Sequence, residues 1–464
     1  MSPTPVQRNV LEMIGHTPLV AVQGFDTGPC ELYLKLESQN PSGSIKDRVG
    51  LYMIEAAERA GRLEPGATLV EATAGNTGLG LALAARRKGY PLRLVIPDKM
   101  SREKIFHLKA MGAEVVMTRS DVPQGHPDYY QDRAARIARE TPHAFYVNQF
   151  ANESNPEAHE RTTAPEIWEQ MEHRLDAVVC GVGTGGTLTG LSRFFARTAP
   201  GVEIVLADPQ GSALAGHVRA GHAGSAGQAG RAGRGWLVEG IGGDHVPPVC
   251  DLSRVRHAVS VSDAESFNTC RELLLREGIL GGTSTGTLLA AALRYCRGQR
   301  TARRVVSLVC DSGNKYLSKV YNDFWMLDQG FLTRERFGDL RDLIARRHAE
   351  GADVTVAANE TLLAAYGRMK LYDVSQLPVM RGGRIAGIVD EEDVLLEVFE
   401  HPERFDEPVS RVMASSLVTV APDASLSQLL EVFKRGLVAI VMHRGELLGL
   451  ITRIDVLNWL RRRM

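Results

Sequence analysis

The first 325 residues alternate short apolar segments with longer stretches of helical periodicity. Segments with strand character cover residues 31–37, 68–72, 92–96, 114–117, 176–181, 203–207 and 304–309. Between several of them, apolar residues recur with helical spacing at 49–60, 79–88 and 103–111. This alternation is typical of α/β domains with mostly parallel sheets. Residues 211–235, in contrast, are rich in Gly and Ala without an apolar period, and we expect a flexible surface loop there.

The C-terminal part of the chain repeats itself. Residues 354–357 (VTVA) recur at 418–421, and the segment 387–395 recurs in altered form at 449–457. Each copy has the pattern strand, helix, strand, strand, helix, and we expect the copies to pack together because neither buries much core alone. We therefore expect a catalytic core, a link and two repeated domains, at residues 1–325, 326–350, 351–405 and 406–464.

Composition and charge narrow the possible functions. The chain has 464 residues, and its 54 Lys+Arg nearly balance its 55 Asp+Glu, which gives no electrostatic footprint for nucleic acid or an anionic membrane. Its apolar runs are far shorter than the roughly 18 residues that cross a bilayer, and the N-terminus lacks a signal-peptide core. The six cysteines form no C-x-x-C pair. We therefore expect a cytoplasmic protein without a disulfide framework or a metal site.

Lys46 is the first candidate for chemistry. It follows a segment rich in Pro, Ser and Gly and opens a predicted helix, whose positive end lowers the pKa of an amine. Such a lysine can act as a nucleophile or form a Schiff base. Taken alone, however, the pattern favours an exposed lysine paired with a neighbouring carboxylate.

Two glycine-rich loops each lie between a predicted strand and a predicted helix. Backbone N–H groups at a helix start bind anions. The loop 73–78 (TAGNTG) suits the carboxylate of a small substrate, or it is a simple turn in which Asn76 takes an unusual backbone angle. The loop 181–187 (GVGTGGT) has four glycines and two threonines, which favours a phosphate.

Two further patterns leave alternatives open. Gly181, Gly183 and Gly186 satisfy G-x-G-x-x-G, and Asp208 ends the next strand, as in a dinucleotide site. An NAD(P)-dependent oxidoreductase is therefore an alternative, although it leaves Lys46 without a role. Ser284, in a third glycine cluster, either bonds a buried heteroatom or caps the following helix, and the residues alone favour the cap.

Together these motifs resemble the fold-type II pyridoxal-phosphate enzymes of the β-replacement group, and more specifically the cystathionine β-synthase family. The resemblance runs over nearly the whole chain, through segments 15–19, 41–48, 73–78, 97–101, 183–187, 238–242 and Ser284. The repeats resemble a tandem pair of CBS domains, known as a Bateman module. The resemblance implies a tryptophan-synthase-β-like core of two α/β subdomains, followed by an α+β pair of CBS domains.

The resemblance also implies a role for each motif residue. Pyridoxal 5′-phosphate would be bound covalently by the catalytic Lys46, with Asn76 at its 3′-oxygen and Ser284 at its pyridine nitrogen. Its phosphate would lie in a cup formed by Gly183, Thr184, Gly185, Gly186 and Thr187. The substrate carboxylate would be bound by Thr73, Gly75, Thr77 and Gln149, and the second substrate would be flanked by Gly240 and Gly242.

The activity implied is a lyase that condenses L-serine with L-homocysteine to L-cystathionine in transsulfuration and cysteine biosynthesis, and that also releases hydrogen sulfide from cysteine plus homocysteine. Ala74, Phe150 and Gly243 stand where family members carry hydroxyl side chains, which keeps O-acetylserine sulfhydrylase (cysteine synthase) as an alternative. We expect no haem, because only about 14 residues precede Gly15 and none is Cys or His.

The C-terminal repeats have two possible roles. Thr452 and Asp455 form the T-x-x-D pattern that holds a ribose in CBS domains, whereas the first repeat has Asp390 and Asp393. One interpretation is a sensor for S-adenosylmethionine or another adenosyl ligand, and the other is a dimerising module with an empty cleft. Apart from amino-acid substrates, we expect the partners to be further copies of the chain, in a homodimer or homotetramer.

Overall fold

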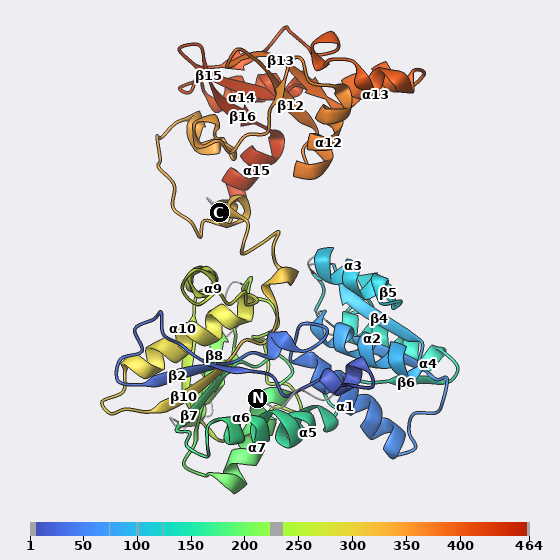
Figure 1. Cartoon of the computed structure of the whole chain (residues 1–464), viewed down its shortest axis with the longest axis vertical. Helices are drawn as coiled ribbons and strands as arrows, with labels where there is room; N and C mark the ends of the chain where they lie inside the picture. Colours follow the sequence, from blue (N-terminus) through green and yellow to red (C-terminus); the bar gives the residue numbers. More distant parts are fainter. Residues whose placement is uncertain are drawn as a thin grey trace. The chain divides into compact units, whose positions relative to one another are not determined.

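The computed structural model describes residues 6–73, 75–98, 100, 102–123, 125–222 and 235–461. The chain divides into two compact units, Met1–Asn322 and Asp323–Met464 (Figure 1). No helix of the described residues is long and apolar enough to cross a membrane.

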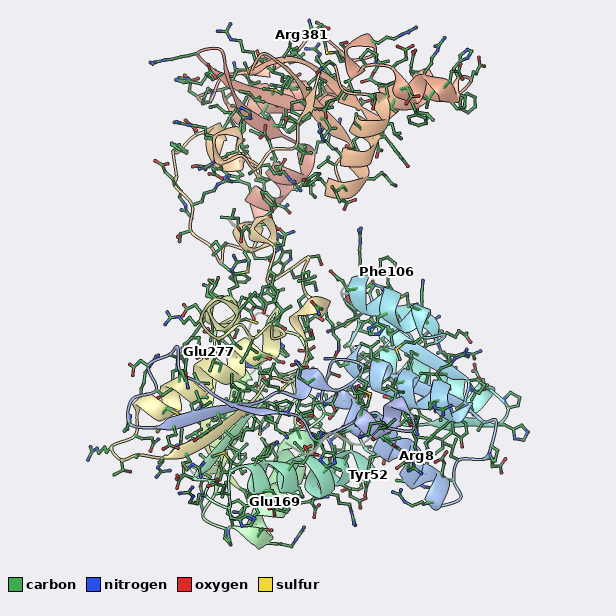
Figure 2. The ribbon with its side chains drawn as sticks, viewed as in Figure 1. Arg8, Tyr52, Phe106, Glu169, Glu277 and Arg381 are labelled. Carbon is green, nitrogen blue, oxygen red and sulfur yellow. The ribbon has the colours of Figure 1, made fainter. Side chains whose placement is uncertain are left out.

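The first unit contains a six-stranded sheet with the order β1-β2-β10-β7-β8-β9. Its strands are β1 (Leu19–Ala21), β2 (Glu31–Lys35), β7 (Ala177–Cys180), β8 (Glu203–Pro209), β9 (Val255–Val261) and β10 (Arg304–Leu308). All neighbours are parallel except β1 and β2. Helices cover both faces of this sheet (Figure 1). At the end of one of them, the carboxylate of Glu277 accepts the backbone N–H groups of Gln23 and Gly24, which fastens the β1–β2 connection (Figure 2).

A four-stranded parallel sheet with the order β5-β4-β3-β6 forms a second subdomain of the same unit. Its strands are β3 (Thr68–Ala72), β4 (Leu92–Pro97), β5 (Glu114–Thr118) and β6 (Ala144–Tyr146). Its helices are α1 (Lys46–Arg59), α2 (Asn76–Lys88), α3 (Arg102–Ala110) and α4 (Tyr130–Glu140). Leu69, Leu81 and Leu94 are fully buried between them. The predicted fold of two α/β subdomains is therefore confirmed.

The α-helices of the first unit that follow β6, together with one π-helix, surround the larger sheet. They are α5 (Ser154–Ala158), the π-helix η3 (His159–Thr163), α6 (Ala164–Gln170), α7 (Gly186–Thr198), α8 (Leu214–His222), α9 (Asp263–Glu277) and α10 (Thr283–Arg297). Helix α8 corrects the expectation of a loop at 211–235. The buried side chains of Leu214 and Val218 pack it against the protein, while residues 223–234 lie outside the described part.

Helices α1 and α2 cross so closely that only glycine fits between them. A Cβ added at Gly50 would lie 2.5 Å from the carbonyl carbon of Gly80, and one at Gly80 would lie 2.3 Å from the carbonyl oxygen of Lys46. The crossing places the start of α1 beside the first turns of α2. Since ligands of open α/β sheets bind beyond the carboxyl ends of the strands, this is where a site is expected.

The second unit consists of two copies of one motif. The first copy comprises β11 (Val356–Ala357), α12 (Leu362–Tyr372), β12 (Gln376–Arg381), β13 (Arg384–Asp390) and α13 (Glu391–Val398). The second comprises β14 (Thr419–Val420), α14 (Leu426–Lys434), β15 (Ala439–His443), β16 (Glu446–Ile451) and α15 (Arg453–Arg461). The sheets of the two copies even share an irregularity, at Val379/Met380 and Val441/Met442. The predicted repeat is therefore confirmed.

The stretch 326–350, which we expected to be a link, is partly structured. It contains the end of α11 (Asp323–Asp328) and a short 3-10 helix, Leu340–Leu343. Leu340, Leu343 and Ile344 are buried in the core of the second repeat. The whole stretch thus belongs to the second unit, Asp323–Met464, instead of linking two units.

Candidate active site

Lys46 is the first residue of α1, and two contacts fix the backbone around it. The buried carboxylate of Asp47 accepts hydrogen bonds from the backbone N–H of Ser42 (2.6 Å) and from its hydroxyl. Burial raises the pKa of Asp47 to about 6. The backbone N–H of Ile45 donates to the carbonyl oxygen of Cys310 at 2.9 Å, which ties the start of α1 to the loop after β10.

The Lys46 side chain is half-buried, and its amine has no hydrogen-bond or ion-pair partner among the described residues. Burial lowers its pKa, and nearby Cys310 and Asp311 offset part of this effect. An amine in such surroundings loses its proton more readily and is more nucleophilic than a surface lysine. The exposed, paired lysine that the local pattern favoured is therefore wrong.

The residues predicted to bind the substrate carboxylate lie together at the start of α2. The Thr73 hydroxyl accepts the backbone N–H of Gly75 at 3.0 Å, and Gly75 has a φ of +123° that favours glycine. The Thr77 hydroxyl donates to Oε1 of Gln149 at 2.5 Å, and both side chains are buried. Ala74 lies outside the described residues, as do Lys99 and Ser101 of the segment 97–101.

Glu71, on β3, lies directly behind this group. Its Oε2 accepts the backbone N–H of Gln149 at 3.3 Å, and its Oε1 has no partner. Complete burial raises the pKa of Glu71 to about 8, although hydrogen bonds from Gln149 act in the other direction. Burial therefore favours the protonated, neutral form of this carboxyl group.

The predicted phosphate cup lies between β7 and α7. A Cβ at Gly183 would lie 2.3 Å from the carbonyl oxygen of Gly240, and one at Gly185 would lie 2.3 Å from Cβ of Cys250. Larger residues cannot adopt this loop without displacing their neighbours. The loop ends at the N-terminus of a 13-residue helix, whose first N–H groups have no partner within the helix and attract an anion.

Gly240 and Gly242 lie directly beside this cup. The backbone N–H of Gly242 donates to the carbonyl oxygen of Val182 at 2.8 Å. Both glycines have positive φ angles, and a Cβ at Gly242 would lie 2.7 Å from the ring of Trp236. The structure thus brings the predicted second-substrate loop to the predicted cofactor loop.

Ser284 is the second residue of α10 and is buried. The N-cap of that helix is Gly282, so the cap that the residues alone favoured for Ser284 is wrong. The Ser284 hydroxyl instead lies beside the thiol of Cys310. Burial raises the pKa of that thiol to about 12, and the hydrogen bond with Ser284 offsets part of the rise. Ser284 and the Lys46 loop therefore meet at the same strand end.

Sequence reasoning missed a polar group that follows β10. The Oδ2 of buried Asp311 accepts hydrogen bonds from Nδ2 of Asn76 and from the hydroxyl of Tyr316, both at 2.7 Å. The Lys315 amine donates to Oδ1 of Asn76 at 2.8 Å, and burial lowers its pKa to about 8. Both ends of the Asn76 carboxamide are therefore held from the larger subdomain. A polar run after a buried parallel strand was the signal available in the sequence.

A second polar chain joins the two subdomains. The buried Lys104 amine, from α3, donates to Oε2 of Glu239 at 2.8 Å and to the Tyr316 hydroxyl at 2.9 Å. Lys319 donates to the other oxygen of Glu239 at 2.7 Å. These charge-assisted bonds fix the distance between the two sheets on either side of the site.

Asp208, the acid of the dinucleotide alternative, holds a helix instead. Its Oδ2 accepts the backbone N–H of Ala215 at 2.9 Å at the start of α8. An acid in a dinucleotide site must face the ribose. This contact gives Asp208 a structural role.

In the second unit, the T-x-x-D residues bond to each other. Thr452 donates to Oδ2 of Asp455 through its backbone N–H (2.7 Å) and its hydroxyl (2.5 Å). Asp390 and Asp393 make the corresponding reciprocal capping contacts at the start of α13. These contacts suffice to begin the helices, and they leave the adenosyl site a proposal.

Comparison with known proteins finds two families along the chain. A family model described as "Pyridoxal-phosphate dependent enzyme" matches residues 10–311, and a model described as "CBS domain" matches residues 342–400 and 409–462. The cystathionine beta-synthase of Dictyostelium discoideum is 34% identical over 471 residues, which cover 98% of this chain and 92% of that protein. Cysteine synthase A of Escherichia coli (strain K12) is 39% identical over 308 residues, 66% of this chain and 92% of that protein.

Two solved structures resemble the chain in part. A hydrogen sulfide-producing enzyme from Fusobacterium nucleatum has 35% identity and a TM-score of 0.62, and it covers 67% of this chain and 100% of its own. An O-acetylserine dependent cystathionine beta-synthase from Helicobacter pylori has 31% identity and a TM-score of 0.62, with coverage of 69% and 100%. Of these four proteins, the Dictyostelium one covers nearly the whole chain.

Proposed function

The chain belongs to the pyridoxal-phosphate dependent enzymes and, over its full length, to the cystathionine β-synthase family, and from this membership we propose that it condenses L-serine with L-homocysteine to L-cystathionine by β-replacement. The observation that carries the proposal is the half-buried amine of Lys46, which has no partner among the described residues and lies on the side of the sheets where the glycine cup also lies. The NAD(P)-dependent oxidoreductase is wrong, because the matched family uses pyridoxal phosphate.

The described residues fit this cofactor. Pyridoxal phosphate, when bound, supplies an aldehyde that takes up an amine and a conjugated ring that withdraws electrons from the attached carbon. The cup would hold the phosphate, Lys46 the aldehyde and Asn76 the 3′-oxygen. Ser284, a neutral hydroxyl, would leave the pyridine nitrogen unprotonated, which favours early loss of the β-substituent over reprotonation of the carbon.

Lys46 would move the protons of the reaction. With the substrate rather than Lys46 attached to the cofactor, the Lys46 amine would be free to act at the substrate Cα. Its lowered pKa lets it take the Cα proton as a general base. The same amine would then deliver that proton to the hydroxide that leaves Cβ, which departs as water. When the homocysteine sulfur adds to Cβ, Lys46 would take up the thiol proton and return it to Cα.

The loop at the start of α2 would orient the substrate. Thr73, Thr77 and Gln149 are buried and adjacent, and N–H groups at the helix start attract a carboxylate. The loop of Gly240 and Gly242 would border the second substrate. Because burial favours the neutral form of Glu71, its repulsion of the substrate carboxylate would be reduced.

The choice of the first substrate depends on help for the leaving group. Phe150 has no hydroxyl group with which to help, and its ring packs edge-on against that of Tyr130, with 6.3 Å between the ring centroids. Acetate leaves more easily than hydroxide, so O-acetylserine is the natural rival donor, and cysteine synthase is the alternative function. We favour serine because Lys46 itself can protonate the hydroxide.

Steady-state kinetics with paired substrates test this proposal. We expect kcat/KM for serine with homocysteine to exceed that for O-acetylserine with sulfide. The opposite order by a wide margin would assign the chain to cysteine synthase. With cysteine and homocysteine, we expect release of hydrogen sulfide, measured in the same assay.

We further propose that the enzyme acts in the cytoplasm as a homodimer or homotetramer. The CBS repeats have their own buried cores, so they can form an assembly module or bind an adenosyl ligand such as S-adenosylmethionine near Thr452 and Asp455. Light scattering with and without that ligand tests both roles.

A further inference from the structure

The segment from α5 through η3 to α6 packs against the start of α7 at very short range. A Cβ at Gly186 would lie 2.0 Å from Oδ1 of Asn155, and one at Gly190 would lie 2.7 Å from Cβ of His159. Gly186 and Gly190 are one turn apart and so lie on the same face of α7. The packed segment contains the π-helix His159–Thr163. Such turns are rare in proteins, and those that occur are often found at functional sites.

Two side chains of this segment reach the threonines of the predicted phosphate cup. Nδ2 of Asn155 donates to the hydroxyl of Thr184 at 2.8 Å. Nε2 of His159 lies 3.2 Å from the hydroxyl of Thr187, and its Nδ1 lies 2.9 Å from the hydroxyl of Thr163. Asn155, His159 and Thr163 are completely buried. The side chains of Thr163, His159 and Thr187 therefore form a hydrogen-bond chain from the protein interior to the cup.

His159 is neutral in this position. Burial holds its pKa well below the usual range, and the cations Lys46 and Arg48 act in the same direction. A neutral imidazole has one N–H group and one bare nitrogen, so it donates on one side and accepts on the other. The protons in the hydrogen bonds from Thr163 through His159 to Thr187 can therefore be arranged in only two ways.

The two arrangements differ in the fate of the Thr187 proton. If Nδ1–H donates to Thr163, then Nε2 must accept the Thr187 proton, and that hydroxyl cannot donate into the cup. If Thr163 donates to Nδ1, then Nε2–H donates to Thr187, whose own proton is free for a ligand. A phosphate with two negative charges offers acceptors only, so it requires the second arrangement.

We infer that His159 is a positioning residue for the phosphate cup: with Thr163 donating to its Nδ1, it directs the Thr187 hydroxyl proton toward the bound phosphate. The inference rests on the proposed function, because it takes the anion to be the phosphate of pyridoxal phosphate. It assigns Thr163, which touches no ligand, a role in cofactor affinity.

The test uses the full-length holoenzyme labelled with ¹⁵N at histidine, with His159→Gln to assign the signal among the 13 histidines. We expect a protonated Nε2 and a bare Nδ1 for His159 in the wild type. Thr163→Val keeps the shape but cannot donate, and we expect it to weaken pyridoxal-phosphate binding roughly tenfold, since hydrogen bonds to charged groups are strong. Thr163→Ser, the matched control, keeps the donor and should bind as the wild type does.

Two results would overturn the inference. One is a protonated Nδ1 in the wild-type holoenzyme, and the other is equal cofactor affinity of Thr163→Val and Thr163→Ser. A wild type that binds no pyridoxal phosphate would instead refute the proposed function, so the two failures are distinguishable.

Discussion

The Glu71 carboxyl group makes the stability of the protein depend on pH in a direction unusual for an acid. Its pKa is raised by burial from 4.5 to about 8, so between these values the folded state holds a proton that the unfolded chain has released. The stability that this group contributes is complete below pH 4.5 and is lost as the pH rises to 8. Each pH unit in this window lowers the free energy of unfolding by about 1.4 kcal/mol, or roughly 4 to 5 kcal/mol in all.

Glu71→Gln removes this loss, because the amide stays neutral and can still accept the backbone N–H of Gln149. We expect the variant and the wild type to be similar in stability near pH 5, and the variant to gain steadily up to pH 8. Urea unfolding from pH 5 to 9 measures the difference, in which other titrating groups cancel. Glu64→Gln, at an exposed carboxylate, is the matched control. A difference for Glu71→Gln that does not change with pH would refute the reasoning.

The other predictions concern the cofactor site and the repeats. Lys46→Ala should fold and keep the phosphate cup but lose nearly all turnover, and a cystathionine assay showing wild-type activity would contradict its assignment. Ser284→Asp should keep the cofactor but lose β-replacement, because a carboxylate would keep the pyridine nitrogen protonated; unchanged rates would show that Ser284 does not face the ring. Truncation near residue 330 should leave a folded core that absorbs as the holoenzyme does, since every proposed cofactor contact lies in 1–322. If calorimetry detects an adenosyl ligand, Asp455→Ala should abolish its binding; no binding to the wild type would make the repeats an assembly module.

Periodicity located the long elements but not the polar ends on which the site depends. The apolar pattern predicted a helix from residue 79, whereas α2 begins at Asn76, because its first turn is polar and faces the site. Helix α8 was missed because Gly and Ala dominate its surroundings, although buried Leu214 and Val218 hold it in place.

Contacts between segments far apart in the chain could not be predicted from the sequence. Ser284 looked like a helix cap, and only the start of α10 at Thr283 shows that Gly282 holds that position. Asp311 meets Asn76 across 235 residues of sequence, and His159 meets Thr187 across 28. No local pattern predicts such pairs, since the packing of sheets and helices brings them together.

Borohydride reduction followed by peptide mass spectrometry tests the central claim most directly. Reduction converts the bond between a lysine and pyridoxal phosphate into a stable one, so the modified residue can be identified without measuring activity. We predict a single modification, on the peptide that contains Lys46. Modification of Lys315, whose pKa is also lowered and which lies at the same site, or no modification at all would contradict the account.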